Sequence, residues 1–265
     1  MFSFKDLINE KSKPLVMGIL NVTPDSFSDG NEAFTEKDAL NKLNVLCNEG
    51  ADIIDVGACS TAPGKGVVTE EEEIRRLRKF LPSIVMYSTV PVSIDTFRPR
   101  VAEYALSAGV SVINDESGKF QPEMAQLVKS NKCGWIFMHT GNGSSSDVTE
   151  YENGIIADVK KFFCFMKRQA VSFGINEDSL CYDMGIGFGK TRDDDLTLLS
   201  NVKSLSEFTP LLAGVSRKRI IGELTGEKNP KNRISGSVAV AGILAEDGVE
   251  ILRVHDVKET LKAVR

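Results

Sequence analysis

The stretch L-V-M-G-I-L-N-V-T-P-D-S-F-S-D-G, residues 15–30, sets a pattern that the rest of the chain repeats. Its first part, residues 15–20, is an apolar run typical of a strand that is buried on both faces. A polar loop follows the run, and residues 35–48 then have helical periodicity with one apolar face. The sequence therefore predicts a unit of strand, loop and helix near the start of the chain.

The same alternation recurs along the whole length. Further strand-like runs lie at residues 52–56, 92–94, 111–114, 135–138, 180–183, 211–214 and 251–254. Helical patterns lie at residues 69–80, 99–107, 122–129, 151–173, 194–205, 234–245 and 256–264. No Pro-rich or Ser-rich linker separates these units, which predicts one α/β domain over residues 1–265, a single (β/α)8 TIM barrel. A doubly wound sheet is the alternative, because strand number alone does not show closure.

Composition excludes several classes of partner. The 265 residues are 42% hydrophobic and 26% charged, with a formal net charge of -5. A mildly acidic chain lacks the basic surface that binds nucleic acid or an anionic membrane. No apolar run approaches the roughly 18 residues of a membrane span, and residues 1–13 lack the apolar segment of a signal peptide. We therefore expect a cytoplasmic protein with no nucleic-acid or membrane partner.

The five cysteines include no C-x-x-C pair. Cys47, Cys164 and Cys181 sit among apolar neighbours, as small core residues do. Cys59 lies in a loop of small and hydroxyl residues, 57–66, where no motif supplies a base to activate it. We expect Cys59 to be a bystander thiol.

In a barrel, the functional site lies where strands end and loops begin. The loop that starts at Asn21 has amide and carboxylate oxygens, which suit a hard cation such as Mg²⁺ that shares its ligands with substrate phosphates. A solvated turn is the alternative. Asp95, Asn114 and Asp183 end three other strands and favour a polar ligand, because such groups are costly to bury unpaired. Helix capping is the alternative for any one of them.

Residues 183–191 resemble a phosphate-binding loop but fail its pattern, because Met184 stands where the first glycine is required. A tight turn beside a flat ligand is more plausible. Ser216 is expected to cap the helical pattern that follows it, beside a run of cations. Alternation along a strand places Arg253 and His255 on one side. We expect a cationic cluster that binds an anionic ligand, formed by Arg217, Lys218, Arg253 and His255. His139, at the end of the fifth strand, could be structural or functional.

Six blocks, in order along the chain, are similar to those of the dihydropteroate synthase family. They are M-G-I-L-N-V-T-P-D-S-F-S-D-G (17–30), S-I-D-T (93–96), I-N-D (113–115), D-M-G-I-G-F-G-K (183–190), S-R-K (216–218) and R-V-H-D-V (253–257). The resemblance implies a barrel that condenses 6-hydroxymethyl-7,8-dihydropterin pyrophosphate with p-aminobenzoate in folate synthesis, releasing pyrophosphate. It also implies a Mg²⁺ cofactor, a homodimer and a target for sulfonamides.

The resemblance assigns roles to individual residues. Those implied to bind the pterin are Asp95, Asn114, Met138, Asp183, Phe188, Gly214 and Lys218. Those implied to bind the diphosphate are Asn21, Arg253 and His255, with Asn21 also facing Mg²⁺. Those implied to bind p-aminobenzoate are Phe27, Thr61, Pro63 and Ser216. The implied catalytic set is Asp95, Lys218, Arg253 and His255.

The chain departs from the family pattern on the p-aminobenzoate side. Ala62 replaces the usual Arg of S-T-R-P-G, and Lys65 cannot reproduce the bidentate fork of an arginine. Asp195 stands where an Asn is usual. Two alternatives to an active synthase stay open, of which Ala62 motivates the first. One is a catalytically weak paralogue that holds pterin, and the other is a barrel methyltransferase that presents a methylated folate to a corrinoid protein.

Overall fold

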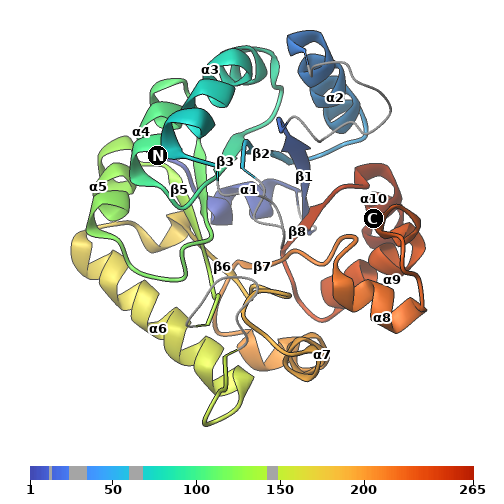
Figure 1. Cartoon of the computed structure of the whole chain (residues 1–265). Helices are drawn as coiled ribbons and strands as arrows, with labels where there is room; N and C mark the ends of the chain where they lie inside the picture. The colour runs from blue at the N-terminus through green and yellow to red at the C-terminus, as the bar shows by residue number, and fades with distance from the viewer. Residues whose placement is uncertain (12–13, 24–34, 60–67, 142–148) are drawn as a thin grey trace.

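Eight parallel strands close into a barrel in the computed structural model, which describes residues 1–11, 14–23, 35–59, 68–141 and 149–265. Each strand pairs with the next in the chain, and β8 closes the ring against β1 (Figure 1). The strands are β1 (Leu15–Asn21), β2 (Ile53–Gly57), β3 (Val92–Asp95), β4 (Val112–Asp115), β5 (Gly134–Met138), β6 (Leu180–Asp183), β7 (Leu211–Ala213) and β8 (Ile251–Val254). Closure confirms the predicted (β/α)8 barrel and rules out the doubly wound sheet.

Helices surround the barrel, as Figure 1 shows in a view along its axis. The α-helices are α1 (Phe4–Lys11), α2 (Glu36–Asn48), α3 (Glu70–Tyr87), α4 (Pro99–Ser107), α5 (Pro122–Asn131), α6 (Ile155–Phe173), α7 (Arg192–Ser200), α8 (Arg219–Thr225), α9 (Ile234–Glu246) and α10 (Val257–Val264). Short 3-10 helices are η2 (Glu177–Ser179), η3 (Val202–Leu205) and η4 (Pro230–Asn232). No helix in the described part of the chain is long and apolar enough to cross a membrane.

Several helices differ from the sequence expectation, and among them α6 begins at Ile155 rather than at residue 151. Helix α3 continues through Pro82 to Tyr87, because its buried face extends beyond the proline to Ile84. Helix α7 starts earlier than predicted, since Thr191 and Asp194 form a capping box, and it ends at Ser200 before η3 begins. Helix α1 has no counterpart in the prediction, which considered residues 1–13 only as a possible signal peptide.

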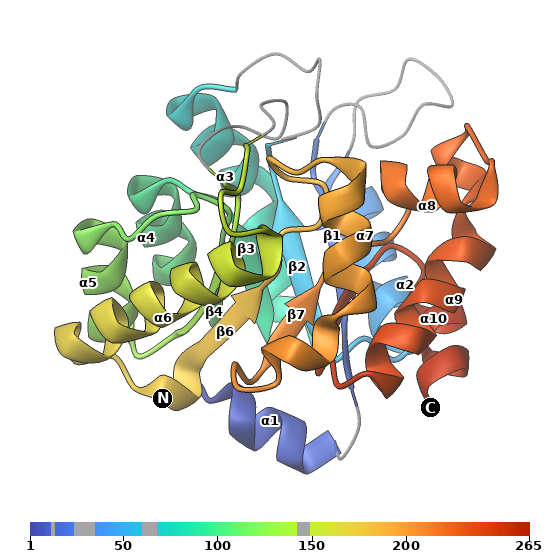
Figure 2. The same cartoon turned by 90° about the horizontal axis from the view of Figure 1, so that it is seen from below.

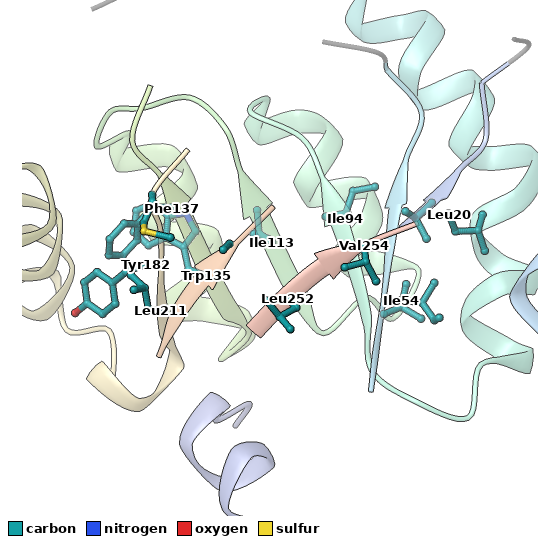
Figure 3. Close-up of a cluster of buried hydrophobic side chains, with 14 of the residues drawn as sticks. Leu20, Ile54, Ile94, Ile113, Trp135, Phe137, Tyr182, Leu211, Leu252 and Val254 are labelled. Carbon is teal, nitrogen blue, oxygen red and sulfur yellow. The ribbon is translucent and has the colours of Figure 1, made fainter. Parts of the chain in front are cut away.

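The outer faces of the strands pack against the helices in the larger part of the core. Figure 3 shows these side chains on neighbouring strands, including Trp135, Phe137 and Tyr182. The rings of Phe137 and Tyr182 meet edge to face with centroids 5.0 Å apart, and Phe163 of α6 lies 5.2 Å from Tyr182. This packing fixes β5 and β6 against α6.

The inner faces of the strands form a second, smaller apolar layer at the amino end of the barrel. Helix α1 lies across that end (Figure 2), and Phe4 projects into it with none of its surface exposed. A Cβ on Gly134, the first residue of β5, would lie 3.0 Å from the ring of Phe4. The layer comprises Phe4, Leu15, Met17, Ile53, Val112, Ile136, Cys181, Leu212 and Ile251. The amino end of the barrel is therefore closed by apolar packing.

The cysteines are all free thiols. Cys181 is buried in the inner layer and Cys47 is half-buried, but Cys164 is exposed on α6. The core placement expected for Cys164 is therefore wrong, because the buried face of α6 is carried by the neighbouring Phe163 and Met166.

Candidate active site

The opposite end of the barrel interior is polar. Side chains along a strand alternate in direction, so the residue two positions after an inner-layer residue also points inward. Asn114 follows Val112 in this way, and Asp183 follows Cys181. The same spacing of two residues separates Met138 from Ile136, Gly214 from Leu212 and Arg253 from Ile251. The register pairs Gly57 with Asp95 and Asp95 with Asn114, so the predicted pterin residues of β3 and β4 are direct neighbours.

Arg253 is held between two carboxylates inside this polar end. Its Nε donates to Asp55 Oδ2 at 2.7 Å, and its Nη2 donates to Asp95 Oδ2 at 2.6 Å. Asn114 Nδ2 donates to the same Asp55 oxygen at 3.1 Å. Burial alone would lower the pKa of the guanidinium, but Asp55 and Asp95 outweigh it and raise that pKa above its ordinary value. Arg253 is therefore a permanent cation in the site.

Asp55 was missed by the sequence reasoning. It lies in the middle of the apolar strand β2 with none of its surface exposed, and its Oδ1 has no hydrogen-bond partner among the described residues. The signal that would have found it is a carboxylate in a run of residues that should all be apolar, because an unpaired buried charge is costly.

Glu116 was also missed, since an acid just after a strand looks like a surface residue. Burial raises the pKa of Asp95 well above its ordinary value, and the Glu116 carboxylate raises it further while Arg253 opposes both. Glu116 is half-buried and its side chain hydrogen-bonds Asp95. The site therefore holds two carboxyl groups near Arg253, those of Asp55 and Glu116, that the motifs do not indicate.

The turn after β6 forms a second wall of the site. Gly185 N donates to Asp183 Oδ1 at 2.8 Å, which orients the carboxylate. Lys218 Nζ donates to the Ile186 carbonyl at 2.6 Å and lies 4.6 Å from the centroid of the Phe188 ring. Burial raises the pKa of Asp183 and lowers that of Lys218, and each group counteracts the shift of the other. An acid and a cation therefore face each other beside an aromatic ring.

Gly214 has no side chain to fill the region between the Lys218 and Arg253 side chains. A Cβ at this position would lie 3.8 Å from Lys218 Nζ and 3.8 Å from Arg253 Cβ. Met138 pairs with Asp183 across β5 and β6. The predicted pterin residues thus come together at one end of the barrel, with hydrogen-bonding groups from Asn114, Asp183 and Lys218 and apolar surface from Met138 and Phe188.

Two expectations about the loop after β7 are wrong. Ser216 does not cap α8, because the helix begins at Arg219 with Lys218 at its N-cap position, after Arg217 turns the chain at φ 60°. Ser216 Oγ instead accepts a hydrogen bond from the His255 backbone N at 3.2 Å. Arg217 pairs with Asp256 through Nε at 2.9 Å and Nη2 at 2.5 Å, so an acid neutralises one member of the predicted cationic cluster.

His255 also differs from its predicted place in that cluster. The residue is exposed in part, but the surrounding protein and the nearby cations Arg253 and Arg217 lower the pKa of its imidazole to about 3. The ring is neutral near pH 7 and can donate a hydrogen bond without adding charge. Arg253 and Lys218 remain as the positive groups of the predicted cluster.

His139 has a structural environment. Its ring is buried against Tyr151 and Phe162, and its Nε2 lies 2.8 Å from Asp158 Oδ1. Burial and the nearby Lys190 lower the pKa of the ring to about 4. Cys59 is half-buried and burial raises the pKa of its thiol, which suits the expected bystander.

Asn21 ends β1 beside β2. A Cβ added to Gly57 would lie 2.9 Å from Asn21 Oδ1 and 3.6 Å from Asp95 Oδ2, so a larger residue there would displace the Asn21 side chain. The predicted p-aminobenzoate residues Phe27, Thr61 and Pro63 lie outside the described residues, as does Ala62.

Comparison with known proteins agrees with this geometry. A model of the family described as pterin binding enzyme matches residues 17–255, which places the barrel and its polar end in that class. The chain is 39% identical to dihydropteroate synthase of Escherichia coli strain K12 over 256 residues, covering 96% of this chain and 90% of the relative. The chain belongs to the dihydropteroate synthase family, and it is therefore a transferase.

Two solved structures extend the match to three dimensions. Dihydropteroate synthase of Xanthomonas albilineans with 4-aminobenzoic acid has a TM-score of 0.88 and 41% identity, covering 95% of this chain and 90% of that one. The enzyme from the same organism in complex with 7,8-dihydropteroate has a TM-score of 0.85 and 39% identity, covering 95% and 91%.

Proposed function

We propose that the chain condenses 6-hydroxymethyl-7,8-dihydropterin pyrophosphate with p-aminobenzoate, giving 7,8-dihydropteroate and pyrophosphate. The observation that carries this proposal is the juxtaposition of Asp183, Asn114 and Lys218 with the partly buried cation Arg253 at one end of the barrel. Asp183 can accept two parallel N–H bonds from the aminopyrimidinone edge of a pterin. Arg253 offers charge to the diphosphate attached to the same ligand.

The residues would act by position and charge. The C–O bond between the pterin methylene and the diphosphate breaks, and a C–N bond to the amine of p-aminobenzoate forms as that amine releases a proton. Arg253 stabilises the negative charge that develops on the leaving diphosphate, and neutral His255 donates a further hydrogen bond. Asp95 lies beside Arg253 and stabilises the electron-poor pterin methylene. No covalent enzyme intermediate is needed.

Mg²⁺ fits the donor set at the end of β1. The described residues contain no group of three or more His, Cys, Asp or Glu side chains that could hold a metal ion by themselves. Mg²⁺ commonly takes one or two protein oxygens and completes its shell with water and substrate phosphates. We propose that Asn21 supplies a protein oxygen and the substrate diphosphate supplies others. The bound ion would neutralise charge on the diphosphate.

Steady-state release of pyrophosphate, with both substrates and with or without Mg²⁺, tests the proposal. We expect turnover that depends on both substrates and on Mg²⁺, and that sulfonamides inhibit in competition with p-aminobenzoate. Tight pterin binding without pyrophosphate release above background would favour the catalytically weak paralogue instead. In the same assay, Ala62→Arg is expected to lower KM for p-aminobenzoate roughly tenfold or more, since a hydrogen bond to a charged group contributes about 1.5–3 kcal/mol.

We further propose a homodimer in which α9 faces its partner. Ser235, Ala239 and Ile243 recur every four residues on the exposed face of this helix, and Ile243 is 57% exposed. Small and apolar residues on one stripe allow a second helix to approach closely. Light scattering coupled to gel filtration is expected to give the mass of two chains for the native protein and of one chain for Ile243→Glu. A monomeric native protein would refute the dimer.

A further inference from the structure

Lys190 ends the glycine-rich turn that imitates a phosphate-binding loop, but it points into the protein. The residue is only 3% exposed. Its Nζ donates to the carbonyls of Gly185 at 2.8 Å, His139 at 2.9 Å and Phe188 at 3.0 Å. An ammonium group has three N–H donors, so these carbonyls use all of them. No donor of Lys190 is left for a substrate.

The three carbonyls belong to two neighbouring walls of the site. His139 directly follows the end of β5, while Gly185 and Phe188 belong to the turn after β6. The two walls touch, because a Cβ on Gly185, whose φ is +65°, would lie 1.9 Å from the His139 carbonyl oxygen. Lys190 therefore ties the turn to the end of β5 at the point of closest approach.

The same turn carries groups that face the pterin space. The N–H of Gly185 orients Asp183, and the ring of Phe188 lies against Lys218. Asp195 of α7 holds the turn from the other side, since its Oδ1 accepts from Gly187 N at 2.8 Å. Movement of the turn would displace Asp183 and Phe188 together.

We propose that Lys190 is a positioning residue that sets the width of the pterin site by fixing the glycine-rich turn against the end of β5. This inference rests on the proposed function, because it assigns the space between Met138, Asp183 and Phe188 to the pterin. Lys190 touches no substrate in this role and acts through the three carbonyls.

The role makes pterin affinity depend on pH. Burial lowers the pKa of Lys190 to about 7. A neutral amine has two N–H donors, so deprotonation leaves one of the three carbonyls without its partner. The charged or titratable groups that face Lys190 are Asp183, Asp194, Asp195, Lys218 and His139. We expect pterin affinity to fall as the pH rises from about 6 to about 9.

Calorimetry with 6-hydroxymethyl-7,8-dihydropterin pyrophosphate tests the inference in the whole protein. Lys190→Met is expected to weaken binding of this probe at least tenfold at about pH 6 and to flatten its pH dependence. Lys190→Arg is expected to restore part of the affinity, because a guanidinium can also donate to several carbonyls. The control is Lys258→Met, at an exposed position of α10, which should bind like the native protein.

Kinetics separate positioning from a general loss of structure. KM for the pterin substrate should rise in Lys190→Met, while KM for p-aminobenzoate at saturating pterin changes less than twofold. An unchanged pterin Kd, or equal rises in both KM values, would overturn the inference. If Lys190→Met does not fold, a flat pH profile of pterin affinity in the native protein overturns it. A native protein that binds no pterin would instead refute the proposed function.

Discussion

The two ends of the barrel interior are built from the same strands but differ in polarity. At the amino end, Ile136, Cys181 and Ile251 pack with Phe4 in a closed apolar layer. Two residues further along the same strands, Met138, Asp183 and Arg253 form the wall of the site. Among the described residues, the amino end is mainly apolar apart from Ser93, which pairs with Val112 and whose buried Oγ has no hydrogen-bond partner. The other end holds at least two buried carboxylates and a cation.

Along each of these strands, the inward-facing residue that stabilises the fold and the inward-facing residue that belongs to the site are therefore only two positions apart. Burying Ile136 contributes hydrophobic free energy without any requirement for a partner. Burying Asp55 and Arg253 costs desolvation, which their hydrogen bond, the donation from Asn114 to Asp55 and the contact of Arg253 with Asp95 offset. Substitutions at the amino end should therefore change folding, whereas substitutions at the polar end should change ligand binding and, where a charge is left unpaired, folding as well.

Arg253→Ala tests the polar end with the largest expected effect. We expect kcat/KM to fall roughly 100- to 1,000-fold, because the leaving diphosphate loses its main cation. Stability should fall by about 3–5 kcal/mol, since buried Asp55 loses its partner. Calorimetry should show loss of pyrophosphate binding while bare 6-hydroxymethylpterin still binds. Equal loss for both ligands would contradict the diphosphate role.

A double variant serves as the control for that experiment. Asp55→Asn combined with Arg253→Ala removes the unpaired charge, so it should recover much of the lost stability without recovering pyrophosphate binding. Recovery of both properties would show that Arg253 acts only by neutralising Asp55.

Ile136→Ala and Met138→Ala form a matched pair on β5, one in each layer. Ile136 is fully buried, and its truncation should lower the free energy of unfolding by about 2–5 kcal/mol because a cavity forms in the closed layer. Pterin affinity per folded molecule should stay the same. Met138→Ala should weaken pterin affinity through lost contact surface. Urea titration and calorimetry measure both properties, and a loss of pterin affinity in Ile136→Ala alone would break the separation.

The polar end should also set the acid limit of the fold. Burial lowers the pKa of His139 to about 4 from the ordinary value of 6.5, so the unfolded chain binds a proton more readily than the folded one. Stability is complete above about pH 6.5 and is lost as the pH falls toward 4. The expected loss from this residue at about pH 5.5 is about 1 kcal/mol.

His139→Gln checks that expectation, because Gln can donate to Asp158 but cannot take up a proton. Urea unfolding of both proteins between about pH 7 and about pH 5 should show a shallower loss of stability in the variant. Identical pH dependence would mean that other groups set the acid limit.

Local pattern was sufficient for most of the fold. The apolar runs at β6 and β8 match their predicted bounds, and the other strands differ by a few residues at their ends. Strands covered by helices leave this clear signal because their outward-facing positions are apolar, even though inward-facing residues such as Asp55 and Arg253 are polar. Closure was an inference from the repeat and the length, which the pairing of β1 with β8 confirms. Helix α1 was not predicted, since its function in the fold is the packing of Phe4 into the amino end of the barrel, which is a tertiary contact.

The sequence by itself determined the barrel, the end that carries the site, and the family, because strand periodicity and the blocks from Asn21 to His255 are local. The tertiary structure decided which charges meet. In the fold, Arg217 pairs with Asp256, and Arg253 lies between Asp55 and Asp95. Lys190 points inward and donates to three carbonyls. Apart from the bonds of Lys190 to Gly185 and Phe188, these contacts join residues far apart in the chain. Their energies depend on burial and distance, which no local pattern of residues records.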